Sequence, residues 1–448
     1  MDDPRARLNF STDTVFFDTV FTTVGSTTKR FTVKNPHNKK MRINSIELAG
    51  GKDSDYRLNI NGTQSHRVTD VKLDARDSLF IFVEVTIDPT QVSQPMVVKD
   101  SVVFIRERQK QDVKLISWGQ DAHLIKDEVL GTQTWKSDKP YLIYHAATVD
   151  TNATLTLEAG TRIHFHRNSR LNVAGTLHSE GTKEAPVVFQ GDRLENDYSD
   201  IPAQWDGIWL MPTSHGNHIH HTTIKNAITG LQLDSMASTQ HPTLTLSNSR
   251  ILHMSHAGIL ARGSTIQADN TVIADCGTYA LALTMGGRYE FYHCTLANYW
   301  SGTTRNTPSL LLNNYEIKST GNVRIRDLEK ARFSNCIIYG NRMEEIGLDF
   351  QEAGARQYFF NHCLVRKHPQ KPIAADKKKN LLVNKNPLFV SVQEDNFRLD
   401  TLSPAIDQGD ITTGNDFPTD ILNNSRINDE APDLGAYEYI PGTGSPNE

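Results

Sequence analysis

Asn335-Cys336-Ile337-Ile338 is one of six short segments of this chain that repeat the same order of residue types. Each has an Asn or His, then a small residue, then a variable residue and finally an aliphatic residue. The small and aliphatic residues are two positions apart, so both point to the same side of a β-strand. The other five copies are His221-Thr222-Thr223-Ile224, Asn248-Ser249-Arg250-Ile251, Asn270-Thr271-Val272-Ile273, His293-Cys294-Thr295-Leu296 and His362-Cys363-Leu364-Val365.

The distances between successive copies indicate the fold. Measured between the aliphatic residues, the steps are 27, 22, 23, 42 and 27 residues. Repeats of this size without a helical period are typical of the coils of a parallel β-solenoid. We therefore predict buried columns of small and aliphatic residues, with the Asn and His side chains stacked at a corner. We assign that corner column a structural role and no chemistry.

The bulk composition excludes several classes of protein. The chain has 448 residues and a formal net charge of −5, which argues against a nucleic-acid partner. The only concentrated basic stretch, Asp376-Lys377-Lys378-Lys379-Asn380, is predicted to be a solvated loop. No run of eighteen apolar residues is present, so the sequence predicts no membrane-spanning helix.

The cysteines are predicted to be free thiols. The chain has four, and Cys294, Cys336 and Cys363 all occupy the small-residue position of the repeat. Their spacing is not that of a zinc site. Inward side chains on stacked strands lie parallel to one another, an arrangement that does not suit a disulfide.

The pattern along the chain predicts an all-β protein with three parts. Residues 1–122 contain short alternating strands such as 79–85, separated by Asn-Pro and Gly-Gly turns, and predict an antiparallel Ig-like β-sandwich. Residues 123–385 begin with strand–turn–strand units such as 155–165 and predict a right-handed parallel β-helix. Its 42-residue step holds an excursion over about 299–330. Residues 386–448 are rich in turns and predict a cap that closes the last coil.

Two regions resemble a known group of proteins. Ser403-Pro404-Ala405-Ile406-Asp407-Gln408-Gly409-Asp410 and Asp433-Leu434-Gly435-Ala436-Tyr437-Glu438-Tyr439 resemble the C-terminal region of Bacteroidetes right-handed parallel β-helix proteins, some with the module called choice-of-anchor Q. Residues 10–20 resemble the start of mature Bacteroidetes surface lipoproteins. The resemblance covers nearly the whole chain.

This resemblance implies an extracytoplasmic protein of the cell surface, held on the outer membrane by a lipid. In that case Met1 stands in place of the lipidated Cys, and the signal and the lipid anchor are absent from this sequence. The resemblance implies no single activity, because the β-helix superfamily includes lyases, polygalacturonases and adhesins.

Two enzyme classes with a β-helix fold need carboxylates in fixed arrangements. A lyase of the pectate type holds Ca²⁺ with clustered carboxylates and uses Arg or Lys as the base. A glycoside hydrolase needs aspartates on successive strands, and the coils contain no Asn-x-Asp or Asp-Asp pair. The catalytic residues therefore stay unknown. The outward carboxylates expected in the coils lie at unmatched repeat positions: Asp234, Asp269, Asp275 and Glu290.

Metal binding is not predicted. His215-Gly216-Asn217-His218-Ile219-His220-His221 is rich in possible ligands, but no carboxylate or thiolate accompanies them at a fixed spacing. We interpret these histidines as surface residues or as members of a stacked ladder, with His221 in the corner column. We expect no cofactor, although a structural or catalytic Ca²⁺ is left open. The aspartates near the C-terminus are interpreted as turn residues, with a structural Ca²⁺ as the alternative: Asp407, Asp410, Asp416, Asp420 and Asp433.

The excursion supplies the predicted binding residues. Aromatic side chains on a solenoid wall suit sugar binding, because a sugar ring packs its C–H face on an aromatic ring. Large insertions on a solenoid commonly carry function. The predicted substrate-binding residues are therefore Tyr299, Trp300, Arg305 and Tyr315.

Three functional hypotheses follow. The first is a non-catalytic cell-surface protein that binds a glycan or a partner protein on the β-helix wall. The second is a polysaccharide lyase or glycoside hydrolase acting on an acidic polysaccharide. The third is a structural subunit of an outer-membrane assembly. Lys or Arg beside clustered carboxylates in one groove would favour the enzyme, a wall of exposed aromatics would favour binding, and a large apolar patch would favour the assembly.

Overall fold

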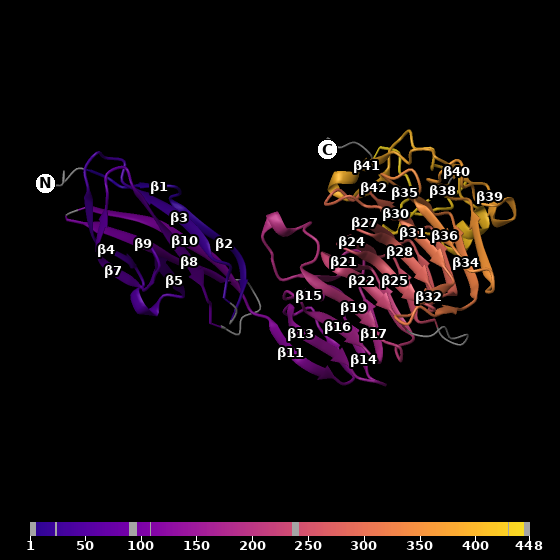
Figure 1. The fold of residues 1–448 in the computed structure, drawn as a ribbon, viewed down its shortest axis with the longest axis horizontal. Coiled ribbons are helices and arrows are strands. Elements are labelled where there is room, and N and C mark those ends of the chain that lie inside the picture. Colours follow the sequence, from indigo (N-terminus) through magenta and orange to yellow (C-terminus); the bar gives the residue numbers. More distant parts are fainter. Residues whose placement is uncertain are drawn as a thin grey trace. The chain divides into compact units, whose positions relative to one another are not determined.

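The computed structural model describes residues 6–22, 25–88, 96–107, 109–234, 242–428 and 430–442. The chain divides into two compact units, Met1–His123 with Leu194–Asn196, and Leu124–Arg193 with Asp197–Glu448. Strands make up nearly all of the regular structure (Figure 1). Within the described ranges the single α-helix is α1 (Ile411–Asp416), and no helix has the length and apolar character needed to cross a membrane.

The N-terminal unit is a sandwich of two five-stranded sheets around one core that includes Phe31, Ile43, Ile81 and Val102, as expected for an Ig-like domain. The helical turn η1 (Gly51–Asp53) precedes β5. One sheet has the order β1 (Asn9–Phe10), β3 (Lys29–Lys34), β8 (Ser78–Val85), β5 (Tyr56–Ile60), β6 (Thr63–Gln64). The other has the order β2 (Thr14–Phe21), β10 (Gln109–Gln120), β9 (Met96–Arg106), β4 (Met41–Leu48), β7 (Arg67–Leu73).

One strand pair of this unit departs from the prediction. β2 runs parallel to β10, with Val15 opposite Leu115, whereas β10 and β9 are antiparallel. The prediction of purely antiparallel strands is therefore wrong at this pair. The sequence pattern does not reveal it, because parallel and antiparallel strands bury alternate side chains in the same way.

The second unit is a parallel β-helix with an 18-stranded and a 10-stranded sheet. The strands of the larger sheet form two ladders, so the coils have three faces, named here A, B and C. β11 (His123–Leu130) pairs with β13 (Tyr141–Val149), whose two halves begin faces A and B. Face A continues with β15 (Arg162–Phe165), β18 (Val187–Gly191), β21 (Thr222–Lys225), β24 (Arg250–Met254), β27 (Val272–Cys276), β30 (Thr295–Asn298), β35 (Ile337–Gly340), β38 (Leu364–Val365) and β40 (Leu382–Val383).

The other two faces complete each coil, and in Figure 1 their strands follow one another along the stack. Face B contains β16 (Arg170–Val173), β19 (Trp205–Leu210), β22 (Ala227–Leu233), β25 (Ala257–Arg262), β28 (Tyr279–Thr284), β31 (Leu310–Asn313) and β36 (Ile346–Asp349). Face C contains β12 (Gln133–Trp135), β14 (Thr154–Leu157), β17 (Thr176–Glu180), β20 (Asn217–His220), β23 (Leu244–Ser247), β26 (Thr265–Asp269), β29 (Gly287–Tyr292), β34 (Leu328–Ser334), β37 (Arg356–Asn361) and β39 (Lys378–Lys379).

The Asn and His residues of the repeat form the corner between faces C and A, as predicted. All six have a positive φ, between 41° and 54°. Asn and His enter this left-handed region more readily than most residues, which explains their place in the motif. Side chains of neighbouring coils also contact each other at the corner, since the Asn335 amide nitrogen lies 3.1 Å from Nε2 of His293.

The small residues of the repeat are all buried, and each makes the same type of hydrogen bond. Their hydroxyl or thiol donates to the carbonyl oxygen two residues earlier, as in Ser249 (2.7 Å) and Cys336 (3.3 Å). Cys294, Cys336 and Cys363 are buried free thiols, as predicted, and so is Cys276. The aliphatic residues stack in register in the core, as Ile251 does on Ile273.

The corner continues through the basic stretch that was predicted to be a solvated loop. Asp376 lies in the helical turn η3 (Ala375–Lys377), and Lys378 and Lys379 form β39 beside Phe360 and Asn361. Asn380 follows with a φ of 50°, and its amide nitrogen lies 2.7 Å from Nε2 of His362. The loop prediction is therefore wrong, because these lysines form part of a further coil.

The 42-residue step is not a single excursion. It contains the face B strand β31, which pairs with β28 and β36. Two departures flank this strand, a loop before it and an antiparallel hairpin of β32 (Tyr315–Ile317) and β33 (Val323–Ile325) after it.

The C-terminal segment (residues 386–442) covers the outer side of face A, whereas the sequence analysis expected it to close the last coil. Phe397, Ile421 and Tyr437 pack on outward side chains of β24, β27 and β30, and Leu399 and Leu434 pack on those of β35 and β38. Figure 1 shows its hairpin of β41 (Phe389–Ser391) and β42 (Asn396–Leu399), which flank the turn η4 (Val392–Glu394), above the strands of face A. The part of face A beneath this segment carries largely apolar outward side chains, which explains why it is covered.

A buried ion pair holds this segment together. Arg426 Nη1 donates to Glu438 Oε2 at 2.9 Å, and both side chains are almost fully buried. Arg426 Nη2 also donates to Oδ1 of Asn270 at 3.0 Å, which links the segment to the corner column. A buried charge is stable only with such partners.

Candidate functional site

The variable position of the repeat forms a column on the outer side of face A. Thr223 stands opposite Arg250, and Arg250 stands opposite Val272. Further along the stack the column continues with Thr295, Ile337 and Leu364. Val272, Ile337 and Leu364 are covered by the C-terminal segment. The column is therefore polar at one end and apolar at the other.

A groove of ≈ 450 Å³ lies between the polar end of this column and the C-terminal segment. Strands β21 and β24 and the corner residues His221 and Asn248 form one side, and residues 394–398 with Ile421, Leu422 and Tyr437 form the other. Thr182, Lys183 and Pro186, from the turn that leads into β18, also line it.

Three cationic side chains line the groove: Lys183, Arg250 and Arg398. None of them has a carboxylate partner within 4.0 Å among the residues that the structure describes. Arg250 Nη2 donates instead to the backbone carbonyl of Asp395 at 2.8 Å. The charge of these three side chains is therefore not neutralised by ion pairs, although Glu394 and Asp395 also line the groove.

A cluster of one histidine and three aspartates lies at the corner between faces A and B. Nε2 of His253 is 2.8 Å from Oδ2 of Asp395 and 3.7 Å from Oδ1 of Asp200. Ligand atoms of these three residues all lie within 4.8 Å of one another. Asp275 sits one coil further on, since β24 pairs with β27, and its Oδ1 accepts from the Tyr299 amide at 3.1 Å. Asp395 belongs both to this cluster and to the groove.

Electrostatics in the cluster follow from burial and crowding. Burial raises the pKa of Asp275 to about 6, the neighbouring His253 opposes that rise, and the charge of Asp395 adds to it. Burial lowers the pKa of His253, but the hydrogen bond to Asp395 and the nearby carboxylates outweigh it, so the net shift is upward. The cluster therefore favours the charged form of the His253 imidazole, whereas it favours the neutral form of the Asp275 carboxyl group.

The four predicted binding residues do not form one surface. Arg305 is buried, and its guanidinium pairs with Glu345 through Nη2–Oε1 at 2.6 Å. Tyr299 packs edge-on against Phe389 of the C-terminal segment. Arg305 lies inside the fold, whereas Tyr299 is partly buried, because the loop that carries them folds back onto the β-helix.

The remaining two predicted residues lie at different places. Trp300 is partly exposed, and its indole nitrogen donates to Thr303 at 3.1 Å. Tyr315 lies on β32 and donates to Oδ2 of Asp349 at 2.7 Å. Asp349 lines a separate groove of ≈ 420 Å³ with Arg342, Glu344 and Lys367. Lys367 and Lys371 both pair with Glu344 there, so among the described residues only Arg342 of its three cations has no carboxylate partner, against three such cations in the groove on face A.

The other residues considered from sequence have local partners. His218 bonds Glu180 (2.9 Å) and His220 bonds Ser247 (2.7 Å). Asp234 accepts from Trp209 (2.8 Å) and Glu290 pairs with Lys330 (2.7 Å). Asp269 and Asp275 lie on different faces, in β26 and β27.

The C-terminal aspartates bond largely to nearby backbone, as expected of turn residues. Asp410 caps α1 by accepting from the Thr413 amide at 3.1 Å. Asp420 accepts from the amides of Leu422 and Asn424, at 2.8 and 2.7 Å. Asp433 accepts from the amides of Asp407 and Tyr439. These oxygens are therefore occupied by protein donors.

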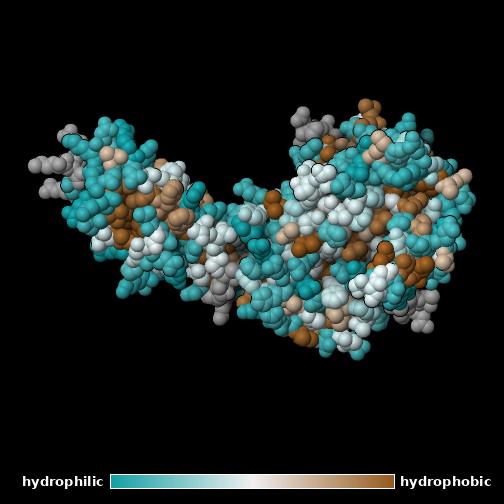
Figure 2. Space-filling model, viewed as in Figure 1, coloured by the Kyte–Doolittle hydropathy of each residue, from teal (hydrophilic) through white to brown (hydrophobic). Residues whose placement is uncertain are grey.

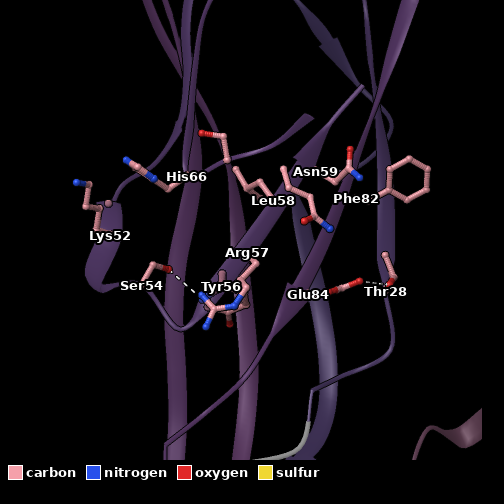
Figure 3. Close-up of a pocket in the computed structure, with 13 residues that line it drawn as sticks. Thr28, Lys52, Ser54, Tyr56, Arg57, Leu58, Asn59, His66, Phe82 and Glu84 are labelled. Atoms are coloured by element: carbon pink, nitrogen blue, oxygen red, sulfur yellow. Dashed lines mark hydrogen bonds between the residues drawn. The ribbon is translucent and has the colours of Figure 1, made fainter. Parts of the chain in front are cut away.

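The N-terminal unit carries a larger hollow of ≈ 600 Å³ on the sheet that contains β5 and β8. Figure 3 shows Lys52 and His66 on one side of it, Phe82, Glu84 and Thr28 on the other, and Arg57 between them. Glu84 accepts a hydrogen bond from Thr28, and Ser54 accepts one from the Tyr56 amide. No three metal-ligating side chains converge there among the described residues.

Comparisons with known proteins support the fold. Residues 235–388 match the family model described as a right handed beta helix region. With the three faces of parallel strands, this match identifies the second unit as a right-handed parallel β-helix. None of the curated proteins matches the sequence. The more specific resemblance to Bacteroidetes lipoproteins with a choice-of-anchor Q module stays a prediction.

Similar solved structures are distant. A family 123 glycoside hydrolase from Clostridium perfringens, studied for glycolipid glycan hydrolysis, is 4% identical over 26% of each chain, with a TM-score of 0.19. PapD-like domain 7 of human CEP192 is 10% identical over 27% of this chain and 89% of that chain (TM-score 0.18). The E. coli chaperone DraB is 13% identical over 25% and 54% (TM-score 0.18). The chain thus spans about a quarter of the length of the hydrolase, and these likenesses carry no functional argument.

Sequence reasoning missed the cluster, although part of it left a signal. His253 and Asp275 each lie two residues after the aliphatic position of their repeat, and both have a positive φ, 58° and 51°. Asn226 occupies the same position one coil earlier, with a φ of 66°. This second polar corner was therefore visible in the spacing. Asp200 and Asp395 come from a loop and from the C-terminal segment, whose positions the repeat does not specify.

Proposed function

We propose that this protein binds an acidic polysaccharide in the groove between face A and the C-terminal segment. The observation that carries the proposal is the set of three cations, Lys183, Arg250 and Arg398, without carboxylate partners among the described residues. Arginine forms paired hydrogen bonds with carboxylate and sulfate groups, so uronic acids and sulfated sugars match this groove chemically.

The polar residues of the groove complete the match. His221, Asn248 and Thr223 offer donors and acceptors for sugar hydroxyl groups. The described β-helix shows no row of exposed aromatic rings, since its large exposed hydrophobic residues are aliphatic, such as Ile228 and Ile317. Charge and hydrogen bonding, rather than stacking on aromatic rings, therefore define the proposed ligand. The proposal includes a location on the cell surface, where such polysaccharides occur.

The test is a calorimetric titration of the full chain with oligogalacturonate, with a neutral oligosaccharide of the same length as the comparison. We expect binding of the acidic sugar only, weakened by added salt because the attraction is electrostatic. Arg398→Gln and Lys183→Gln should each weaken binding about tenfold, the loss expected for one charged hydrogen bond. Both side chains are exposed, so the substitutions leave the fold intact.

Arg288→Gln is the matched control, because Arg288 is an exposed cation on face C. It should leave the affinity unchanged. Equal binding of the neutral sugar, or equal losses in the control and the groove variants, would show that the groove is not the binding site.

A second candidate function is cleavage of the same polysaccharide. Arg250 lies beside Asp395, which lines the groove together with Glu394, so a cation and carboxylates meet at one end of the groove. This combination is the one that acid–base catalysis at a uronic acid requires. Incubation with polygalacturonate, followed by absorbance of unsaturated uronates and by new reducing ends, separates cleavage from binding. Product formation that Asp395→Asn abolishes would establish the enzyme, and intact polymer would leave a binding protein.

A further inference from the structure

The cluster at the corner between faces A and B brings together side chains that are far apart in the sequence. His253 comes from β24, Asp200 from the loop before β19, and Asp395 from the C-terminal segment. Their ligand atoms converge within 4.8 Å. No other group of three His, Cys, Asp or Glu side chains converges in this way within the described ranges.

The charges in the cluster do not cancel. Three carboxylates, Asp200, Asp275 and Asp395, surround one imidazole, and Arg250 points its Nη2 at a backbone carbonyl instead of at a carboxylate. A cation added between the three ligands would compensate this excess of negative charge.

The chemistry of the donors selects the kind of cation. Ca²⁺ and Mg²⁺ prefer oxygen donors alone, whereas an imidazole nitrogen beside carboxylate oxygens suits Zn²⁺ or Mn²⁺. Bonds of about 2.0–2.2 Å to such an ion place the ligand atoms about 3.3–3.5 Å apart. The His253–Asp200 separation of 3.7 Å is close to this value, and the His253–Asp395 separation of 2.8 Å needs only a small opening.

We propose that His253, Asp200 and Asp395 bind one divalent transition-metal ion, Zn²⁺ or Mn²⁺. The ion ties the loop before β19 and the C-terminal segment to the corner of the β-helix. Three protein ligands leave a coordination position for water, and Asp200, with 64% of its side chain exposed, opens the site to solvent. The proposal stands independently of the polysaccharide, because its ligands are His253, Asp200 and Asp395, whereas the polysaccharide proposal rests on the three cations of the groove.

The test is a titration of the full chain, treated with EDTA and then dialysed, with Zn²⁺, Mn²⁺ and Ca²⁺ by calorimetry, together with the melting temperature. We expect one Zn²⁺ per chain, weaker Mn²⁺ in line with the usual order of affinities, and the weakest response to Ca²⁺. Bound metal should raise the melting temperature, because it binds only the folded chain.

Two variants locate the ion. Asp200→Asn should weaken Zn²⁺ binding about tenfold or more, and it spares the fold because Asp200 is exposed. His253→Gln removes the nitrogen donor and should reduce the preference for Zn²⁺ over Ca²⁺.

His218→Gln is the matched control, since His218 also bonds a carboxylate, Glu180, at 2.9 Å. It should leave the affinity unchanged. Absence of Zn²⁺ binding would overturn the proposal. So would binding that survives both Asp200→Asn and His253→Gln, or binding that His218→Gln abolishes, because the ion would then lie among other histidines.

Discussion

Faces A and C belong to the same coils and have the same parallel strands, but their outer sides differ in chemistry. On face A the outward side chains are largely apolar, such as Leu252, Val272 and Ile337, and the C-terminal segment buries them. On face C the outward residues of four successive coils are His178, His218, Thr245 and Gln267, and they remain partly or fully exposed. The inner columns form the core of the β-helix, and the outward residues determine whether another segment packs on a face.

The groove is a consequence of this difference. Where the outer column of face A changes from Val272 to Arg250 and Thr223, the covering segment no longer seals against the strands. Figure 2 shows that, on the side it presents, hydrophobic residues form separate patches among hydrophilic ones. The C-terminal segment packs on the apolar part of face A and leaves the groove at the polar end. Cations and carboxylates lie together in that groove.

The largest expected effect is the loss of packing between the C-terminal segment and face A. Ala274→Glu places a carboxylate between Leu252 and Ala297, its neighbours in the ladder, in the apolar cluster that the C-terminal segment covers. We expect a loss of about 5 kcal/mol or more in the free energy of unfolding, or release of the C-terminal segment. Urea unfolding and limited proteolysis measure the two outcomes. Gln267→Glu, an exposed outward substitution on face C of the same coil, should change stability by about 0.5 kcal/mol or less. Equal effects of the two variants would contradict the difference between the faces.

A smaller effect concerns two ion pairs. Glu438→Gln leaves the buried Arg426 guanidinium without its carboxylate and should cost about 3–5 kcal/mol. Glu290→Gln breaks the more exposed pair with Lys330 on face C and should cost about 1 kcal/mol or less. Chemical unfolding of both variants at neutral pH makes the comparison. A cost for Glu290→Gln as large as that for Glu438→Gln would mean that burial does not separate the two pairs.

The smallest effect is a change with pH at the corner between faces C and A. Burial raises the pKa of Asp269 to about 6, against the opposing charge of Arg426. The folded chain therefore keeps this proton between about pH 4 and 6 while the unfolded chain loses it, so this group lowers stability as pH rises through that window. Asp269→Asn removes the penalty and should stabilise the protein by about 1–2 kcal/mol at pH 7, but not at pH 4.

Urea unfolding at the two pH values measures this difference. Asp376→Asn is the control, because Asp376 is well exposed, and it should behave like the wild type at both. A gain for Asp269→Asn that is the same at pH 4 and pH 7 would rule out the titration of Asp269 as its cause.

The repeat motif was sufficient to predict the stack, because strand period and burial are local properties of the sequence. It places Ile251 and Cys336 in the core, and it places Asn335 at a corner with a positive φ. The motif says little about its variable position, which is where Arg250 and Val272 diverge. Their neighbours come from the C-terminal segment, and a repeat cannot predict contacts between segments about 140 residues apart, such as Arg250 with Asp395.

The four residues predicted to bind substrate do not form one surface in the structure, and Arg305 is buried. Arg305 was interpreted as a surface residue because it lies in an insertion with aromatic neighbours. Its pairing with Glu345 depends on how the loop folds back. Counting two residues beyond Ile251 and Ile273 would have found His253 and Asp275. The positions of Asp200 and Asp395 required the structure.

The most direct test of the account is hydrogen–deuterium exchange of the full chain with and without oligogalacturonate. We predict slower exchange in the peptides that line the groove, 181–186, 221–225, 248–250 and 394–398, and no change along face C in 217–220 and 265–269. Protection along face C, with the groove peptides unchanged, would contradict the claim that the partly covered face A is where this protein meets its ligand.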